Sequence, residues 1–260
     1  MEYTDINFEI RRHVAYITLN RPEVMNAFRG QTCDELIHAL HRAGYDTEVG
    51  AIVLAGAGDR AFCTGGDQSA HEGQYDGRGT IGLPVEELHT AIRDVPVPII
   101  ARVQGYAIGG GNVLATICDL TICGESAVFG QVGPKMGSVD PGYGTAFLSR
   151  VIGEKKAREM WYLCRRYSGQ EAEAIGLANI CVADDELDST VEAWAEEICE
   201  RSPTAIAIAK RSFNMDTAHQ AGIAGMGMYA LKLYYESDES QEGVNALKEK
   251  RAPQFRQFAP

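Results

Sequence analysis

The first half of the chain alternates short hydrophobic runs with amphipathic stretches. Within residues 8–20, the segment HVAYITLN alternates hydrophobic and polar positions and predicts a strand. The runs 50–56 (GAIVLAG) and 99–103 (IIARV) are almost continuously hydrophobic, which is typical of strands buried on both faces. Helical spacing of hydrophobic residues predicts helices over 31–42 and 86–95. This alternation predicts an α/β layered fold with parallel strands.

The second half changes in character, and its predicted elements are mostly helical. One short strand-like run lies at 176–182, and helices are expected over 155–164, 186–201, 203–216, 221–236 and 240–251. Three glycines make the stretch 221–236 a poor isolated helix, so close packing or an interface should hold it. We therefore divide the chain into an α/β core over 1–200 and a helical region over 201–260.

Charge and composition narrow the classes of protein to which the chain can belong. With a net charge of −12, nucleic acid and anionic membranes are not expected as partners. No stretch approaches the roughly 20 apolar residues of a membrane span, and the amino terminus lacks a signal-peptide pattern. The seven cysteines are dispersed without a C-x-x-C pair, which argues against a disulfide framework or a metal site. These features predict a cytoplasmic protein.

Two glycine-rich turns carry the candidate chemistry. The first is RAFCTGGDQ at 60–68, and the second is the triplet in GYAIGGGN at 105–112. One backbone N–H from each turn can converge on a single carbonyl oxygen and form an oxyanion hole, which needs small residues so that a ligand can approach. For each turn alone, the structural alternative is a flexible turn or a tight packing contact.

These motifs resemble those of the crotonase superfamily of enoyl-CoA hydratases and isomerases. RAFCTGGD, GYAIGGGNVLATICDLTIC and AVFGQVGPKMGS follow one another in order, and the resemblance covers essentially the whole chain. It implies a spiral of ββα units, followed by a helical region that forms homotrimers or homohexamers. It also implies an acyl-CoA substrate whose developing negative charge is received by the backbone N–H groups of Gly66 and Gly110.

The chain departs from the hydratases of this family at two positions. The resemblance aligns the two hydratase glutamates with Val113 and Gly133, neither of which can act as an acid or a base. Hydration of a double bond is therefore not expected. Ser138 and Asp140 are two residues apart, so in an extended segment they would face the same pocket. The structural alternative is an Asp-Pro turn with a serine beside it.

Ser138 and Asp140 match a subgroup whose members close or open a carbocyclic ring beside a CoA thioester. The resemblance to that subgroup adds Tyr235, from the same or a neighbouring subunit, as a third catalytic residue. We expect Asp140 to act as a base or proton shuttle and Ser138 to orient it. A raised aspartate pKa would require an apolar wall, for which Met136, Val139 and Trp161 are available. Ring opening, ring closure and a catalytically silent acyl-CoA binder remain open alternatives.

The resemblance also implies contacts with coenzyme A, which is part of the substrate, so no separate cofactor is required. The expected path comprises Val24, Met25, Ala27, Ala61, Gly65, Gly66, Asp67 and Gln68. Lys250 and Arg251 would meet a phosphate, or they form a solvated helix end.

Two further expectations concern an anion and a loop near the site. In the ring-closing members a bicarbonate ion acts as base, and its position here would be near Gln131, Gly133 and Trp161. Val132 replaces a threonine that contacts this anion. The glycine-rich loop 69–83 is expected to be a lid, and its His71 is either solvated or close to the site.

Overall fold

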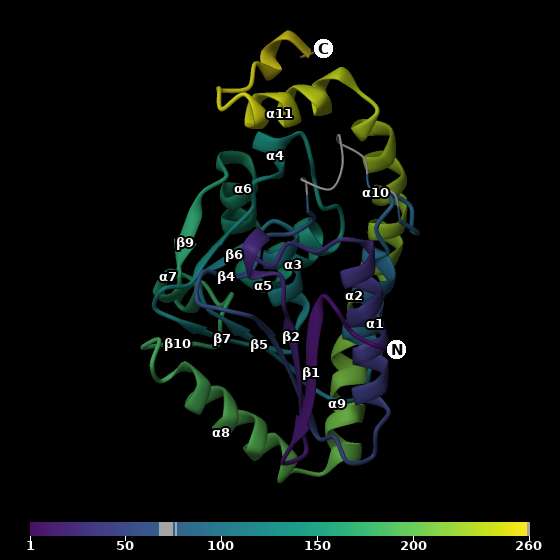
Figure 1. Ribbon diagram of the computed structural model, residues 1–260, viewed down its shortest axis with the longest axis vertical. Helices are drawn as coiled ribbons and strands as arrows, with labels where there is room; N and C mark the ends of the chain where they lie inside the picture. The colour runs from purple at the N-terminus through teal and green to yellow at the C-terminus, as the bar shows by residue number, and fades with distance from the viewer. Residues whose placement is uncertain (68–74, 76, 259–260) are drawn as a thin grey trace.

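Two sheets form the centre of the molecule. The computed structural model describes residues 1–67, 75 and 77–258 (Figure 1). The larger sheet has the order β1-β2-β3-β5-β7-β10, and all of its strand pairs are parallel except β1–β2. Its strands are β1 (Ile6–Arg11), β2 (Val14–Leu19), β3 (Ala51–Gly56), β5 (Ile99–Val103), β7 (Leu120–Gly124) and β10 (Ile180–Val182). The smaller sheet consists of β4 (Ala61–Cys63), β6 (Tyr106–Ile108), β8 (Val128–Gly130) and β9 (Arg166–Ser168).

The chain winds as a spiral of ββα units, which confirms the predicted fold. Each of three successive turns places its first strand in the larger sheet and its second strand in the smaller one, before a helix closes the unit. These units are β3-β4-α2, β5-β6-α3 and β7-β8-α4, and β1-β2-α1 precedes them. The helices are α1 (Gly30–Gly44), α2 (Val85–Asp94), α3 (Gly110–Ile117) and α4 (Gly133–Met136).

The central strands β3 and β5 of the larger sheet are buried on both faces, as their continuously hydrophobic runs predict. On β3, Ile52 and Leu54 pack into the core that α1 and α2 share, whereas Ala51 and Val53 pack on the opposite face. Helix α8 (Leu187–Cys199) covers that opposite face. Alternate residues of one strand therefore join the sheet to helices on both sides.

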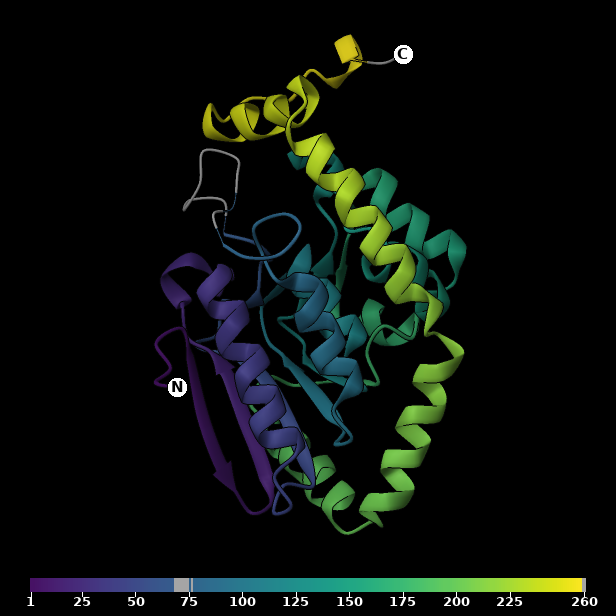
Figure 2. The same ribbon diagram turned by 90° about the vertical axis from the view of Figure 1, so that its right-hand side faces the viewer.

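The last three helices run along the side of the core and over its upper end (Figure 2). They are α9 (Pro203–Asp216), α10 (His219–Tyr235) and α11 (Asp238–Lys248). Lys210 anchors α9, because its buried ammonium donates to the carbonyl oxygens of Ile92 and Val97 and lies 2.7 Å from the Asp119 carboxylate. Helix α10 packs closely on the core at one glycine, since a Cβ on Gly227 would lie 2.3 Å from Pro141.

The remaining helical segments are short. They are η1 (Pro22–Val24), η3 (Tyr143–Phe147), α5 (Leu148–Ile152), α6 (Glu154–Leu163), α7 (Gly169–Ala174) and η4 (Phe255–Phe258). Within the described ranges, no helix is both long and apolar enough to cross a membrane. All seven cysteines lie in the described part of the chain, and all carry free thiols.

Sequence patterns missed several strands and misplaced one helix cap. The polar stretch before residue 14 forms β1, an edge strand on which most side chains are exposed or half-buried, so its hydrophobic signal is weak. Strands β6, β8 and β9 have only three residues each, too few to show a period of two. An aspartate such as Asp184 or Asp185 is a common cap for a helix that starts here, but the N-cap residue of α8 is Glu186, and Asp184 accepts hydrogen bonds from Ser126.

Candidate active site

The topology brings three chemically important segments to one edge of the smaller sheet. Strands β4, β6 and β8 are neighbouring and parallel, so their carboxyl ends meet at the same edge. The first glycine turn follows β4, the glycine triplet follows β6, and the polar segment 131–140 follows β8. A cavity of about 170 Å³ lies there, and its lining includes Gly66, Gly110, Gln131, Ser138, Asp140 and Tyr235.

The two glycine turns touch each other at this cavity. A Cβ built on Gly65 would lie 2.8 Å from the amide nitrogen of Gly110. Among the described residues, no hydrogen bond found uses the amide N–H of Gly66 or of Gly110. Gly110 is the first residue of α3, where backbone N–H groups are free and the helix dipole favours negative charge. Two free backbone donors therefore line one pocket, which is the arrangement an oxyanion hole requires.

A cluster of three polar side chains lines the same cavity. The Oγ of Ser138 and the hydroxyl oxygen of Tyr235, at the end of α10, are 2.8 Å apart, and either group can donate. Oδ1 of Asp140 accepts a hydrogen bond of 2.9 Å from the backbone N–H of Gly144. The sequence led us to expect that Ser138 orients Asp140, but Ser138 contacts Tyr235. Tyr235 reaches this cluster from the same chain.

Burial alters the acidity of both titratable groups in this cluster. It raises the pKa of Asp140 from 3.8 to about 6, although the Gly144 N–H opposes this change by stabilising the carboxylate. Met136, Val139 and Trp161, the residues expected as an apolar wall, all line the cavity. Burial also raises the pKa of Tyr235, so its hydroxyl stays protonated and can donate. Near neutral pH, Asp140 is therefore a stronger base than an ordinary aspartate.

Neither hydratase position offers a carboxylate to the cavity. Val113 is fully buried in α3 and belongs to the hydrophobic core. A Cβ on Gly133 would lie 2.4 Å from the carbonyl oxygen of Ser138 and 2.8 Å from the Trp161 ring. A glutamate at position 133 would therefore have to displace the segment that carries Ser138.

The expected bicarbonate contacts are only partly present. The indole Nε1 of Trp161 donates to the carbonyl oxygen of Gly144, so this N–H is already used inside the protein. Val132 offers no hydroxyl. Gln131 does suit an oxygen ligand, because it is 1% exposed and its Nε2 has no partner among the residues that the structure describes. A bicarbonate ion would thus lack two of the expected contacts, namely the Trp161 N–H and a hydroxyl at position 132.

The expected coenzyme A residues lie in several places. Met25 and Ala61 line a second cavity of about 300 Å³, together with Arg60. Val24 is half-buried in η1, and Ala27 is buried with its carbonyl oxygen accepting from Arg21. Ala61 is the first residue of β4, the strand that the first glycine turn follows.

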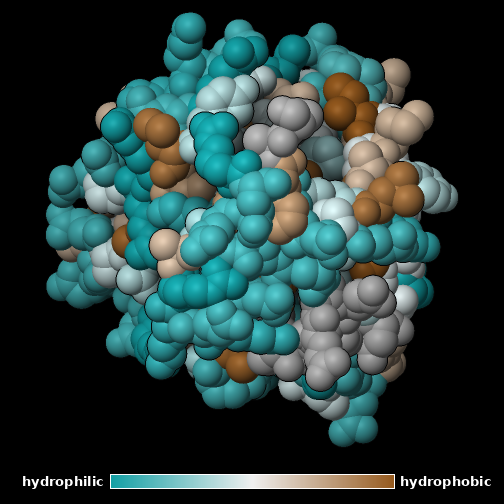
Figure 3. Space-filling model, turned by 90° about the horizontal axis from the view of Figure 1, so that it is seen from above, coloured by the Kyte–Doolittle hydropathy of each residue, from teal (hydrophilic) through white to brown (hydrophobic). Residues whose placement is uncertain are grey.

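The cations expected to bind phosphate lie apart from both cavities in this single chain. Lys250 and Arg251 are exposed after α11, and Arg251 forms ion pairs with Glu242 and Glu249. The molecular end that carries α11 is mostly hydrophilic, with hydrophobic side chains in separate small groups (Figure 3). Arg251 would have to exchange its carboxylate partners for a phosphate.

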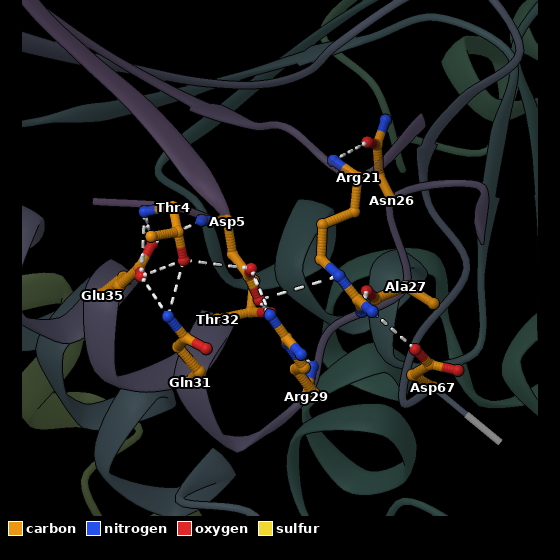
Figure 4. A network of polar contacts seen from close by, with 10 residues as sticks. All are labelled: Thr4, Asp5, Arg21, Asn26, Ala27, Arg29, Gln31, Thr32, Glu35 and Asp67. Atoms are coloured by element: carbon orange, nitrogen blue, oxygen red, sulfur yellow. Dashed lines mark hydrogen bonds and ion pairs between the residues drawn. The ribbon is translucent and has the colours of Figure 1, made fainter. Parts of the chain in front are cut away.

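Two of the named candidates fall outside the described residues, namely Gln68 and His71. Asp67, just before them, forms a buried ion pair with Arg21 (Figure 4). Part of the loop 69–83 is described, and its Tyr75, Ile81 and Leu83 line the active-site cavity.

Several lining residues were missed by the sequence analysis. They are Phe28, Tyr75, Met228 and Leu231, of which the last two come from α10. The hydroxyl of Tyr75 lies close to Gly66, since a Cβ on this glycine would be 2.2 Å from it. No local motif marks these residues, but their aromatic or aliphatic character suits the wall of a small-molecule pocket.

Known sequences and solved structures resemble this chain over nearly its whole length. The sequence model of the enoyl-CoA hydratase/isomerase family matches residues 9–258. An enoyl-CoA hydratase from Mycobacterium avium subsp. paratuberculosis K-10 is 27% identical, with a TM-score of 0.86 over 98% of this chain and 99% of that one. Enoyl-CoA hydratase subunit I from Geobacillus kaustophilus HTA426 is 31% identical, with a TM-score of 0.77 over the same shares of the two chains. OdaA from Pseudomonas aeruginosa is 26% identical, with a TM-score of 0.86 over 94% of this chain and 99% of that one.

Proposed function

This chain belongs to the enoyl-CoA hydratase/isomerase family, whose enzymes act on CoA thioesters, and we propose that it opens a carbocyclic ring by hydrolysis. The substrate is a cyclic β-keto thioester, 2-oxocyclohexane-1-carboxyl-CoA, and the product is pimeloyl-CoA. The enzyme is thus a 2-ketocyclohexanecarboxyl-CoA hydrolase that runs a reverse Dieckmann reaction.

The reaction proceeds through a thioester enolate. Asp140 takes a proton from water as the water oxygen adds to the ring ketone carbon. The bond between that carbon and the α-carbon then breaks, and its electron pair forms the enolate. The N–H groups of Gly66 and Gly110 stabilise the enolate oxygen. Protonation of the α-carbon completes a product that carries one new carboxylate and keeps its thioester.

The observation that carries this proposal is the position of Asp140. It lines the same cavity as the two glycine donors, with its pKa raised to about 6 by burial, while the hydratase positions carry Val113 and Gly133. The contact of 2.8 Å between Ser138 and Tyr235 supports a second role, in which the Tyr235 hydroxyl donates to the ketone oxygen and its tetrahedral alkoxide. Ser138 then orients Tyr235.

We assign the base to Asp140 and derive no step from bicarbonate. The Trp161 N–H is used by Gly144, and Val132 has no hydroxyl to contact an anion. Activity without added bicarbonate, in degassed buffer, is the expected result.

The direct test is incubation with 2-oxocyclohexane-1-carboxyl-CoA, followed by mass spectrometry. We expect the CoA ester to gain the mass of one water molecule without release of free coenzyme A. Release of the free thiol would indicate simple thioester hydrolysis. No reaction, together with cyclisation of succinylbenzoyl-CoA, would instead assign the chain to ring closure, as in 1,4-dihydroxy-2-naphthoyl-CoA synthases.

We also propose that the chain forms a homotrimer or homohexamer through the helices of the region 201–260. Large hydrophobic side chains are exposed along α9 and α10, among them Phe213, Met226 and Leu233 with exposures of 76%, 76% and 69%. Faces of this kind mark interfaces between proteins. Light scattering should give three or six times the chain mass, and Met226→Glu should lower that number. A monomeric wild type would contradict this proposal.

A further inference from the structure

A buried ionic network lies behind the first glycine turn (Figure 4). Arg21, which follows β2, places Nη2 2.8 Å from Oδ2 of Asp67, and its Nη1 donates to the carbonyl oxygen of Ala27. The Arg21 side chain is 12% exposed and that of Asp67 is 5% exposed. The guanidinium therefore ties together two segments, 27–28 and 65–67, that lie far apart in sequence.

The backbone of Phe28 joins the same two segments around Gly66. The Phe28 N–H donates to the carbonyl oxygen of Gly65, and the Asp67 N–H donates to the carbonyl oxygen of Phe28, both at 2.8 Å. These two bonds form a short parallel bridge between Phe28 and Gly66. Because both neighbours of Gly66 are held in this way, the direction of the Gly66 N–H depends on the position of residue 28.

The side chain of Phe28 reaches the second turn. A Cβ on Gly110 would lie 2.7 Å from Cζ of the Phe28 ring, so the ring packs directly against this glycine. Phe28 also lines the active-site cavity. One residue therefore contacts both turns that supply the oxyanion donors, with its backbone at Gly66 and its ring at Gly110.

We propose that Arg21 is a positioning residue for the oxyanion hole. By holding the Ala27 carbonyl oxygen and the Asp67 carboxylate at once, it fixes Phe28 between the two turns and so sets the directions of both donors. The planar fork of an arginine carries donors on separate nitrogens and so reaches two acceptors that lie apart, whereas a lysine ammonium has all its donors on one atom. This inference rests on the proposed function only in that the site polarises a thioester carbonyl.

A neighbouring arginine supplies a matched control. Arg29 donates from Nε and Nη2 to the two oxygens of Asp5, each at 2.8 Å, and Arg21 lies 3.6 Å from the same carboxylate. Arg29 has no hydrogen bond to residue 27 or 67 among the contacts found in the described chain. Arg29 interacts with Asp67 only through its charge, which a lysine keeps, so Arg29→Lys disturbs the same network without removing a hydrogen bond to the segments that carry the donors.

The test measures polarisation of a bound thioester carbonyl by infrared spectroscopy. The probe is cyclohexanecarboxyl-CoA with ¹³C at the thioester carbonyl, which lacks the ring ketone and is not turned over. In the wild type, its carbonyl band should move to lower wavenumber on binding, because two N–H donors polarise the bond. In Arg21→Lys this movement should largely disappear, and in Arg29→Lys it should persist.

Kinetics and stability complete the test. Displacement of oxyanion donors by a distant change costs on the order of 10²-fold in rate, so Arg21→Lys should lose about 10²-fold in kcat with KM almost unchanged. Arg29→Lys should lower the melting temperature to a similar extent while it retains kcat. If Arg21→Lys does not fold, the nearly isosteric Asp67→Asn takes its place. We expect the same loss of the carbonyl band shift and the same fall in kcat.

Two results would overturn the inference. One is a carbonyl band that still shifts on binding, as in the wild type, in Arg21→Lys or Asp67→Asn, and the other is an equal loss of the band shift in Arg29→Lys. Failure of the wild type to open the ring is a separate outcome, because the probe reports polarisation without turnover. A normal band shift in a wild type that does not open the ring would reject the proposed reaction and leave the role of Arg21 standing.

Discussion

The two walls of the active-site cavity are built in different ways. One wall, here the glycine wall, consists of residues 65–66 and 109–110 and offers backbone N–H groups from turns that follow β4 and β6. The other, the polar wall, consists of Ser138, Asp140 and Tyr235, and it offers side chains from a loop after β8 and from the end of α10.

The difference separates two tasks of catalysis. Backbone donors can stabilise a thioester enolate whatever reaction forms it, so the glycine wall does not specify the reaction. The polar wall decides where protons go, because each side chain has its own acidity and position. On the proposed function, the chain shares its thioester chemistry with hydratases and differs from them in its proton chemistry.

The largest effect should come from Asp140→Asn in the polar wall. Loss of a general base costs about 10²–10⁴-fold in rate, so kcat should collapse. Affinity for cyclohexanecarboxyl-CoA should persist, because the glycine wall is intact, and isothermal titration calorimetry measures it. An unchanged kcat would assign the base to another group, and a wild type without turnover would make the chain an acyl-CoA binder.

A smaller loss is expected from Gly110→Ala in the glycine wall. The new methyl group would lie 2.7 Å from the Phe28 ring, so the turn must move and misdirect one donor. We expect kcat to fall by about 10²-fold, and steady-state kinetics measures this loss. Gly222→Ala in α10 is the matched control, since no atom lies within 4 Å of its new Cβ, and it should retain activity. Equal effects of the two variants would contradict the assignment of Gly110.

Tyr235→Phe tests the pair within the polar wall. Removal of a hydroxyl that donates one hydrogen bond should cost on the order of tenfold in kcat. Ser138→Ala should lose a similar factor, because its Oγ lies 2.8 Å from the Tyr235 hydroxyl. The double variant should be no slower than the slower single variant, because the two groups act as a unit. Losses that multiply would show that the two residues act separately.

The smallest effect is on stability and has the opposite sign to the effect on activity. Burial raises the pKa of Asp140 from 3.8 to about 6, so folding disfavours its ionised form. Stability is then lost as the pH rises from about 4 to 6. Asp140→Asn should therefore be more stable than the wild type by up to about 3 kcal/mol well above pH 6 and similar to it below pH 4. Urea unfolding at both pH values measures this, and a destabilised variant at pH 8 would contradict it.

The sequence predicted the site best where its residues directly follow strands or lie close together in the chain. Both glycine turns follow strands, so their meeting at one edge follows from parallel pairing. Ser138 and Asp140 are close in sequence, and both line the cavity. Tyr235 is 97 residues from Ser138, and no spacing rule links them, so only the resemblance pointed to Tyr235, and its contact with Ser138 was not predicted.

Other features depend on tertiary contacts that no local pattern encodes. The Trp161 N–H donates to a carbonyl oxygen 17 residues away in the sequence. It is therefore not available to bind an anion. Phe28 gives no motif of its own, yet it contacts both glycine turns. Helix α3 begins within the glycine triplet, at Gly110, and this places the Gly110 N–H at a helix terminus.

The most direct test of the account is the pH dependence of kcat/KM for opening of 2-oxocyclohexane-1-carboxyl-CoA, which reports the ionisation of free enzyme and free substrate. Because burial raises the pKa of Asp140 to about 6, we expect kcat/KM to fall tenfold per pH unit below about 6. The residual activity of Asp140→Asn should lack this dependence. A rate that stays constant to pH 4, or the same acid limb in Asp140→Asn, would contradict the claim that Asp140 is the base.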